Sequence, residues 1–190
     1  MGLKPLLYYN HSNFGANILK MLGVVKLFVL PYNGYVNVET KVIRQLKLSQ
    51  KTVSVAESCS GGLIAHRLTN VPGCSNVFVG AIIAYSNSVK QKNLQIPPQL
   101  IVEHGTVSKE VAQGMAKGIR KKLGSDYGIG VTGIAGPSGG TKAKPVGLVF
   151  ISVASRNAVR CVKCQFHGER SAIKKKTATQ ALRIISEMIS

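Results

Sequence analysis

The chain has 190 residues, 45% of them hydrophobic, and its 25 lysines and arginines against 7 acidic residues give a formal net charge of +18. This length and apolar content suit one ordinary domain with its own core and exclude a disordered chain. No apolar run approaches the roughly 20 residues that a membrane helix needs, and no secretory leader is recognisable, so we expect a cytoplasmic protein.

The first 37 residues fit the later pattern poorly, and we interpret residues 1–37 as an N-terminal extension. Asn33-Gly34 lies between β-rich runs, which favours a hairpin there. Residues 38–190 are expected to form the main domain, which opens with a helix over Val38 to Leu48. The extension and the domain are therefore treated as separate parts.

Strands and helices alternate from about residue 50. Thr52 to Ala56 is predicted to be a strand, and Gly62 to Leu68 begins a helix. The long apolar run Asn76 to Ser86 indicates a strand buried on both faces. Pro97-Pro98 then acts as a breaker. This part of the chain reads as strand, helix and strand.

A helix between Ser108 and Gly124 is the strongest local prediction, because Ser108 suits an N-cap and Gly124 a stop. Tyr127 to Gly133 is predicted to be a strand, followed by a glycine-rich loop. The remaining predicted elements are two strands that form a hairpin, Val146 to Ser155 and Ala158 to Phe166, and a C-terminal helix with the apolar face Ile173, Thr177, Ala181, Ile184, Ile185 and Met188.

Several motifs are excluded by their context. Gly128 to Gly133 spells GxGxxG but lies inside a strand, and no acidic residue follows about 20 positions later, so a dinucleotide site is not indicated. Ser171 to Lys174 spells SxxK without the partner motifs of serine acylases. Cys161 and Cys164 form a CxxC in a predicted strand, where positions three apart face opposite sides, so we expect free thiols and no metal site.

The stretch Val53 to Leu68 carries the first sign of a functional site. Its sequence, VSVAESCSGGLIAHRL, passes from a strand into small hydroxyl, thiol and glycine residues and then into an amphipathic helix. Small residues at such a turn let a ligand approach the backbone, and the following helix presents unpaired N–H groups to it.

Three separated motifs, AESCSGG, AYSNSVK and GVTGIAGPSGGTKAKPVG, closely resemble the CinA carboxy-terminal domain family. The resemblance covers roughly Val38 to Ser190. Active members of this family are nicotinamide mononucleotide amidases, which form nicotinate mononucleotide and ammonia in pyridine nucleotide recycling. It implies a three-layer α/β/α sandwich with a central mixed sheet, no metal or other cofactor, a mononucleotide substrate, and a homodimer or higher homo-oligomer.

The resemblance also implies a catalytic pair, with Ser58 as nucleophile and Lys90 as its base. A lysine serves as a base only if its pKa falls far enough for a neutral amine to exist near pH 7. Tyr85 is expected to relay or orient the proton. Glu57 is expected either to fix the turn by accepting N–H bonds or to take part in catalysis.

Substrate binding is expected at two backbone segments. The N–H groups of Ser60, Gly61 and Gly62 are candidates for the oxyanion hole. The loop that begins Gly133, Ile134, Ala135, Gly136 is expected to fold over the ribose and phosphate, with Arg170 or Lys144 pairing with the phosphate charge.

Two alternatives to this interpretation remain. One is an amidase whose nucleophile is Cys59. The other is a non-catalytic module of the same fold that binds nucleotides or nucleic acid through its basic surface. The sequence departs from the family pattern at Ser60, where threonine is common, and in residues 1–37, which replace the larger N-terminal domain of full-length relatives.

Overall fold

The structure is a computed structural model that describes residues 37–189. These residues belong to one compact unit, Val36–Ser190. The hairpin predicted at Asn33-Gly34 lies outside the described residues. The helix predicted over Val38 to Leu48 is present as α2, Val38–Ser49, and the side chain of Asn37 caps it by accepting a hydrogen bond from the Thr40 amide.

The domain is a three-layer α/β/α fold around a five-stranded sheet with the strand order β2-β1-β3-β4-β5. The strands are β1 (Val53–Glu57), β2 (Phe78–Ile83), β3 (Tyr127–Gly133), β4 (Leu148–Ala154) and β5 (Val159–Gln165). The sheet is mixed, because β1 runs parallel to β2 and β3, whereas β4 runs antiparallel to both β3 and β5. The predicted fold class and C-terminal hairpin are thus confirmed.

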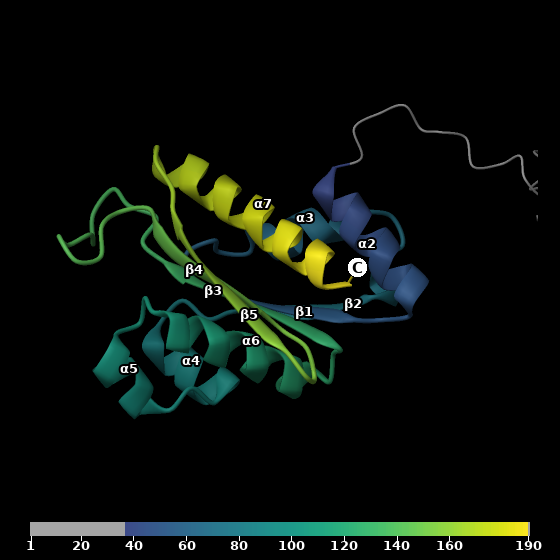
Figure 1. The fold of residues 1–190 in the computed structure, drawn as a ribbon, viewed down its shortest axis with the longest axis horizontal. Helices are drawn as coiled ribbons and strands as arrows, with labels where there is room; N and C mark the ends of the chain where they lie inside the picture. Colours follow the sequence, from purple (N-terminus) through teal and green to yellow (C-terminus); the bar gives the residue numbers. More distant parts are fainter. Residues whose placement is uncertain (1–36, 190) are drawn as a thin grey trace, which may run out of the picture. The chain divides into compact units, whose positions relative to one another are not determined.

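Helices cover both faces of this sheet (Figure 1). One layer contains α2, α3 (Leu63–Thr69) and α7 (Arg170–Ile189), and the other contains α4 (Asn87–Leu94), α5 (Pro98–His104) and α6 (Lys109–Leu123). Each layer has its own apolar core against the sheet. The apolar face predicted for α7 is buried at Ile173, Thr177, Ala181, Ile184 and Ile185.

The prediction for helix α6 is confirmed at both ends. The Ser108 hydroxyl accepts a hydrogen bond from the Val111 amide, and Gly124 ends the helix in the left-handed conformation. Helix α6 lies on β3, where Gly128 and Gly130 leave room for its backbone: a Cβ at either position would collide with main-chain atoms of α6. The first two glycines of the GxGxxG spacing therefore serve helix–sheet packing.

Two predictions were wrong in this region. The run Asn76 to Ser86 is not buried on both faces: β2 is an edge strand, and its residues alternate between partly buried and exposed. Helices α4 and α5 were missed between β2 and α6. Ser86 caps α4 by accepting the Val89 amide, and Pro98 is the first residue of α5, so both starts carry local signals.

Candidate active site

Ser58 directly follows the carboxyl end of β1, which lies between β2 and β3 in the sheet. Its amide continues the β1–β3 pairing by donating to Val131 O at 3.1 Å. Its side chain is almost buried, with 8% of the residue exposed, and it lines a cavity of about 270 Å³. The backbone of the sheet therefore fixes the position of this hydroxyl at the wall of a cavity.

Lys90 comes from helix α4 and is fully buried. Its Nζ donates hydrogen bonds to three oxygens: Ser58 Oγ at 3.2 Å, Ala84 O at 2.8 Å and Tyr85 O at 3.0 Å. The two carbonyls lie in the segment between β2 and α4. The structure thus brings Ser58 and Lys90 together, although 32 positions separate them in the sequence.

Burial changes the proton affinity of this amine. Desolvation lowers the pKa of Lys90 from its ordinary value of 10.5 to about 8. An ammonium has three N–H donors, which match the three oxygens around it. A neutral amine keeps two N–H donors for the carbonyls and directs its lone pair at the Ser58 hydroxyl, which is the geometry of a general base.

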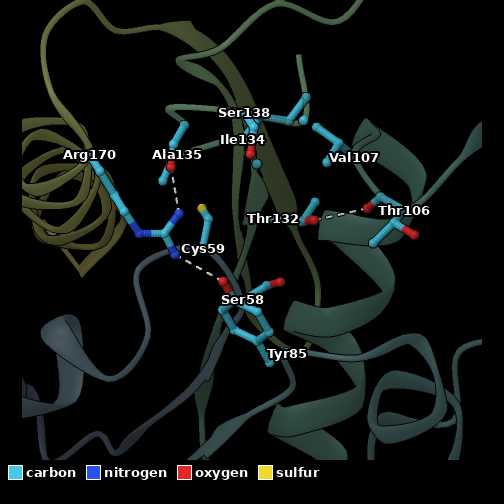
Figure 2. A pocket seen from close by; sticks show the side chains of 13 residues that line it. Ser58, Cys59, Tyr85, Thr106, Val107, Thr132, Ile134, Ala135, Ser138 and Arg170 are labelled. Atoms are coloured by element: carbon cyan, nitrogen blue, oxygen red, sulfur yellow. Dashed lines mark hydrogen bonds between the residues drawn. The ribbon is translucent and has the colours of Figure 1, made fainter. Parts of the chain in front are cut away.

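Cys59 lines the same cavity, and Figure 2 shows its sulfur. The residue is buried, and desolvation raises the pKa of its thiol to about 12. A thiol with such a pKa carries almost no thiolate near neutral pH, and the thiolate is the nucleophilic form. The local chemistry therefore favours Ser58 over Cys59.

Glu57 fixes the turn that follows Ser58. Its fully buried carboxylate accepts hydrogen bonds from the amides of Gly62 at 2.9 Å, Ile64 at 3.2 Å and Ala65 at 2.8 Å. These are the unpaired donors at the start of α3. The turn-fixing role expected for Glu57 matches this geometry.

The same bonds change the expected oxyanion hole. Gly62 donates its N–H to Glu57, and Gly61 donates its N–H to Ser58 O at 3.1 Å. The two glycines adopt φ of +92° and +60°, which form the turn itself. Their N–H groups are therefore already paired, contrary to the expectation from sequence.

Ser60 is fully buried behind this turn and does not line the cavity. Its hydroxyl has no hydrogen-bond partner among the described residues. The side chain lies away from the substrate space, so any contribution of Ser60 to binding comes from its backbone.

Tyr85 and Arg170 form a bridge across the cavity (Figure 2). Arg170, the first residue of α7, donates from Nη2 to the Tyr85 hydroxyl at 2.9 Å and from Nη1 to Gly136 O at 2.6 Å. The Tyr85 phenol therefore bonds to Arg170, and neither Lys90 nor Ser58 contacts it through a hydrogen bond among the described residues. Only the backbone carbonyl of Tyr85 touches the lysine.

The glycine-rich loop after β3 supplies another wall of the cavity. Gly133, Ile134, Ala135 and Gly136, all predicted from sequence, line it. The amide of Ile134 is paired with Leu148 O. Lys144, the alternative cation, does not line the cavity and donates instead to His104 O at 2.7 Å.

Ser138 and Gly139, from the same predicted loop, also line the cavity. Sequence reasoning missed the remaining lining residues, Thr106, Val107 and Thr132. Thr132 Oγ1 donates to Thr106 O at 2.9 Å, which joins the end of β3 to the segment before α6 (Figure 2). Thr132 could have been predicted, because it lies near the carboxyl end of β3. The carboxyl ends of parallel strands lie at the same end of a sheet, and Ser58 follows the carboxyl end of β1.

Residues 37–189 contain no group of three or more histidine, cysteine or acidic side chains arranged to hold a metal ion. Within the same range, no helix combines the length and the apolar character needed to cross a membrane.

Comparisons with known proteins agree with the motifs. The family model of the CinA C-terminal domain matches residues 36–189. The chain is 46% identical over 152 residues to a CinA-like protein of Dictyoglomus turgidum, covering 80% of this chain and 37% of that protein. It is 45% identical over 144 residues to a CinA-like protein of Koribacter versatilis, covering 76% of this chain and 35% of that protein. The chain spans less than half the length of these relatives.

Solved structures extend the likeness to the fold. The competence/damage inducible protein CihA of Agrobacterium tumefaciens is 33% identical, with a TM-score of 0.79, and the match covers 80% of this chain and 94% of that one. A CinA superfamily protein of Klebsiella pneumoniae is 27% identical, with a TM-score of 0.78, over 80% of this chain and 95% of that one. The chain therefore belongs to the CinA C-terminal domain family.

Proposed function

We propose that this chain is an amidase that hydrolyses the carboxamide of nicotinamide mononucleotide to nicotinate mononucleotide and ammonia. The observation that carries the proposal is the 3.2 Å contact between Lys90 Nζ and Ser58 Oγ on the wall of a cavity. A nucleophile beside a base of lowered pKa is what amide hydrolysis without a metal requires. The choice of substrate rests on the resemblance to the family.

The reaction proceeds in two halves. Ser58 Oγ bonds to the carboxamide carbon while its proton passes to Lys90 Nζ, and the carbonyl oxygen takes up the negative charge. The carbon–nitrogen bond then breaks, Lys90 returns the proton to the leaving nitrogen, and ammonia departs from an ester on Ser58. Water attacks this ester, Lys90 passes the water's proton to Ser58 Oγ, and nicotinate mononucleotide leaves.

The oxyanion needs N–H donors that are not already paired. The amides of Cys59 and Ser60 directly follow the nucleophile and donate to no backbone carbonyl among the described residues, although both interact with the Cys59 sulfur. We assign these two amides to the oxyanion hole in place of those of Gly61 and Gly62. In this proposal Ser60 contributes its backbone amide, and its buried side chain does not contact the substrate.

The phosphate of the substrate carries negative charge and needs a cation near the cavity. Arg170 lines the cavity, and its bonds to Gly136 O and the Tyr85 hydroxyl fix its guanidinium there. The loop from Gly133 to Gly136 supplies main-chain contacts to the ribose and phosphate. The family resemblance further implies a homodimer or higher homo-oligomer, which sedimentation velocity measures directly.

The test uses purified protein with nicotinamide mononucleotide and measures ammonia and nicotinate mononucleotide. We expect turnover that persists in chelator, has a half-maximal rate near pH 8, and falls by about 10³-fold or more in Ser58→Ala. The matched control is Cys59→Ser, the adjacent residue, which we expect to remain active. Unchanged turnover in Ser58→Ala, or its loss in Cys59→Ser alone, contradicts the assignment.

A non-catalytic binding module is the second candidate, and the formal charge of +18 favours it. This alternative predicts no ammonia from the wild-type chain. It also predicts affinity for nucleotides or nucleic acid that falls steeply with salt. The same preparation therefore distinguishes the two functions.

A further inference from the structure

A second cavity, of about 360 Å³, lies at the opposite end of the central strands from Ser58. We call it the hairpin cavity, because the turn of the β4–β5 hairpin forms one side of it. Its lining consists of Lys51, Arg120, Gly124, Ser125, Asp126, Tyr127, Ser155, Arg156 and Asn157. These residues lie at the amino ends of β1 and β3, whereas the cavity that Ser58 lines, called the catalytic cavity after the proposed function, lies at their carboxyl ends. Strand β3 separates the two by about 20 Å.

Two arginines of the hairpin cavity are without acceptors. Arg120 Nε is buried and has no hydrogen-bond partner among the described residues. Arg156, whose side chain is exposed, forms no ion pair or hydrogen bond within residues 37–189. By contrast, Arg67 is paired with Glu39 and Arg160 with Glu187. The other N–H groups of the two guanidiniums are available to the acceptors of a ligand in the cavity, which both side chains line.

The charge of the hairpin cavity is unbalanced. Three cations, Lys51, Arg120 and Arg156, face one carboxylate, Asp126, among the lining residues. Asp126 is already engaged by Lys51 Nζ at 3.1 Å and by the amide and hydroxyl of Thr52 at 3.0 and 3.1 Å. Desolvation raises the pKa of Asp126, but these bonds outweigh it and hold the pKa below its ordinary value. An excess of about two positive charges is left for a ligand.

We propose that the hairpin cavity binds a small phosphate monoester of about nucleotide size through the guanidiniums of Arg120 and Arg156. A phosphate monoester carries close to two negative charges at neutral pH and accepts paired N–H bonds from guanidinium groups. The cavity volume lies within the range of small-molecule sites. Ser155 and Asn157 provide further polar groups, and Tyr127 provides an apolar surface.

The site is independent of the amidase proposal but is connected to the catalytic cavity through two shared elements. Arg120 lies on the last turn of α6, and the segment before α6 carries Thr106, which lines the catalytic cavity. Strand β3 runs from Tyr127 at the hairpin cavity to Gly133 at the catalytic cavity. A ligand in the hairpin cavity therefore contacts α6 and β3, and the same two elements adjoin the catalytic cavity.

Nuclear magnetic resonance of the ¹⁵N-labelled full chain tests the proposal, with inorganic phosphate and adenosine monophosphate as probes. We expect saturable shifts of the amides of residues 124–127 and 155–157 with both probes, and tighter binding of the nucleotide. Arg156→Gln is expected to weaken binding by about tenfold or more, because it removes one arm of the guanidinium pair.

The matched control is Lys121→Gln, which removes the same charge from an exposed position next to Arg120. We expect it to change the affinity by less than about twofold. Arg120→Lys keeps the charge but loses the paired N–H geometry, and we expect it to weaken binding while circular dichroism shows an intact fold.

Three results overturn the proposal. Equal weakening by Arg156→Gln and Lys121→Gln indicates diffuse surface charge. Shifts confined to residues 133–139 assign the phosphate to the catalytic cavity. Tighter, salt-sensitive binding of a single-stranded oligonucleotide at the same amides assigns the site to nucleic acid.

Discussion

Fully buried lysines are rare, and burial of Lys90 lowers the pKa of its amine. Burial disfavours the ammonium, and the three surrounding oxygens stabilise it. The balance leaves the pKa at about 8, so that both protonation states are accessible near neutral pH. The same burial that activates the base also reduces the stability of the folded domain at neutral pH.

This effect predicts how stability depends on pH. Because the pKa of Lys90 is about 8 in the folded state and near 10.5 in the unfolded state, the unfolded chain binds more protons between these values. The free energy of unfolding of the wild type should therefore rise relative to Lys90→Met as pH increases through this window, by about 3 kcal/mol in total. Urea denaturation at several pH values measures the difference. A constant difference between pH 7 and 10.5 is incompatible with a lowered pKa.

We propose that Tyr85 positions Arg170 and does not relay a proton. Its hydroxyl bonds to Arg170, so Tyr85→Phe removes a positioning contact and leaves the carbonyl that holds Lys90 in place. We expect KM for nicotinamide mononucleotide to rise about threefold to tenfold while kcat changes by less than about twofold. Steady-state kinetics separates the two constants.

Arg170→Met and the double variant complete a cycle with Tyr85→Phe. If the two side chains act through their mutual bond, the effects on KM are less than additive. A large fall in kcat with unchanged KM in Tyr85→Phe would instead support a role for the Tyr85 hydroxyl in proton transfer.

At the scale of elements, the start of α3 depends on a side chain from the preceding strand. The Glu57 carboxylate accepts three amides of this helix start, and both of its oxygens are used. Glu57→Gln replaces one acceptor oxygen with an NH₂ group that faces a backbone N–H. We expect a loss of about 1–3 kcal/mol in the free energy of unfolding, together with slower turnover because Ser58 directly precedes this turn.

Thermal and urea denaturation check this prediction, with Glu103→Gln as the control on an exposed carboxylate of α5. The control should change stability by less than about 0.5 kcal/mol. Equal stability of Glu57→Gln and the wild type would show that the turn forms without the carboxylate.

Local signals explain which elements were predictable. Helix α6 has a serine cap, a glycine stop and a regular apolar face, and β3 is bounded by turn residues, so both follow from sequence. Helix α4 has only eight residues and a mixed pattern, because its one site-directed side chain is a buried lysine. This mixed pattern explains why the helix that carries Lys90 was missed.

The position of β2 was not predictable for a different reason. An apolar run looks the same in a central strand and in an edge strand, since the order of strands depends on how the connections cross the sheet. Likewise, the sequence suggested that Glu57 accepts N–H bonds in the turn, but it did not show that one of these donors is Gly62, a candidate for the oxyanion hole. Chain topology, and not composition, decides these features.

At the scale of the whole molecule, the described site is built within one compact unit, Val36–Ser190. The residues that line the catalytic cavity, and Lys90 behind it, all lie in this unit. We therefore propose residues 38–190 as the functional domain and residues 1–37 as an extension, as the sequence suggested.

A chain that starts at Val36 should unfold in one cooperative transition and keep the kcat of the full chain within about twofold. Circular dichroism during thermal unfolding and the ammonia assay measure both properties. Loss of the transition, or of activity in a folded truncated chain, would show that the first residues complete the domain or the site.

The two carbonyl acceptors of Lys90 have a consequence for engineering. Ala84 and Tyr85 hold the amine through main-chain oxygens, which every amino acid carries. Randomising position 85 alters the entrance to the catalytic cavity but leaves both acceptors in the chain. Substitutions at Tyr85 should therefore change the substrate preference without removing the hydrogen bonds that hold Lys90, because those bonds are made to backbone carbonyls.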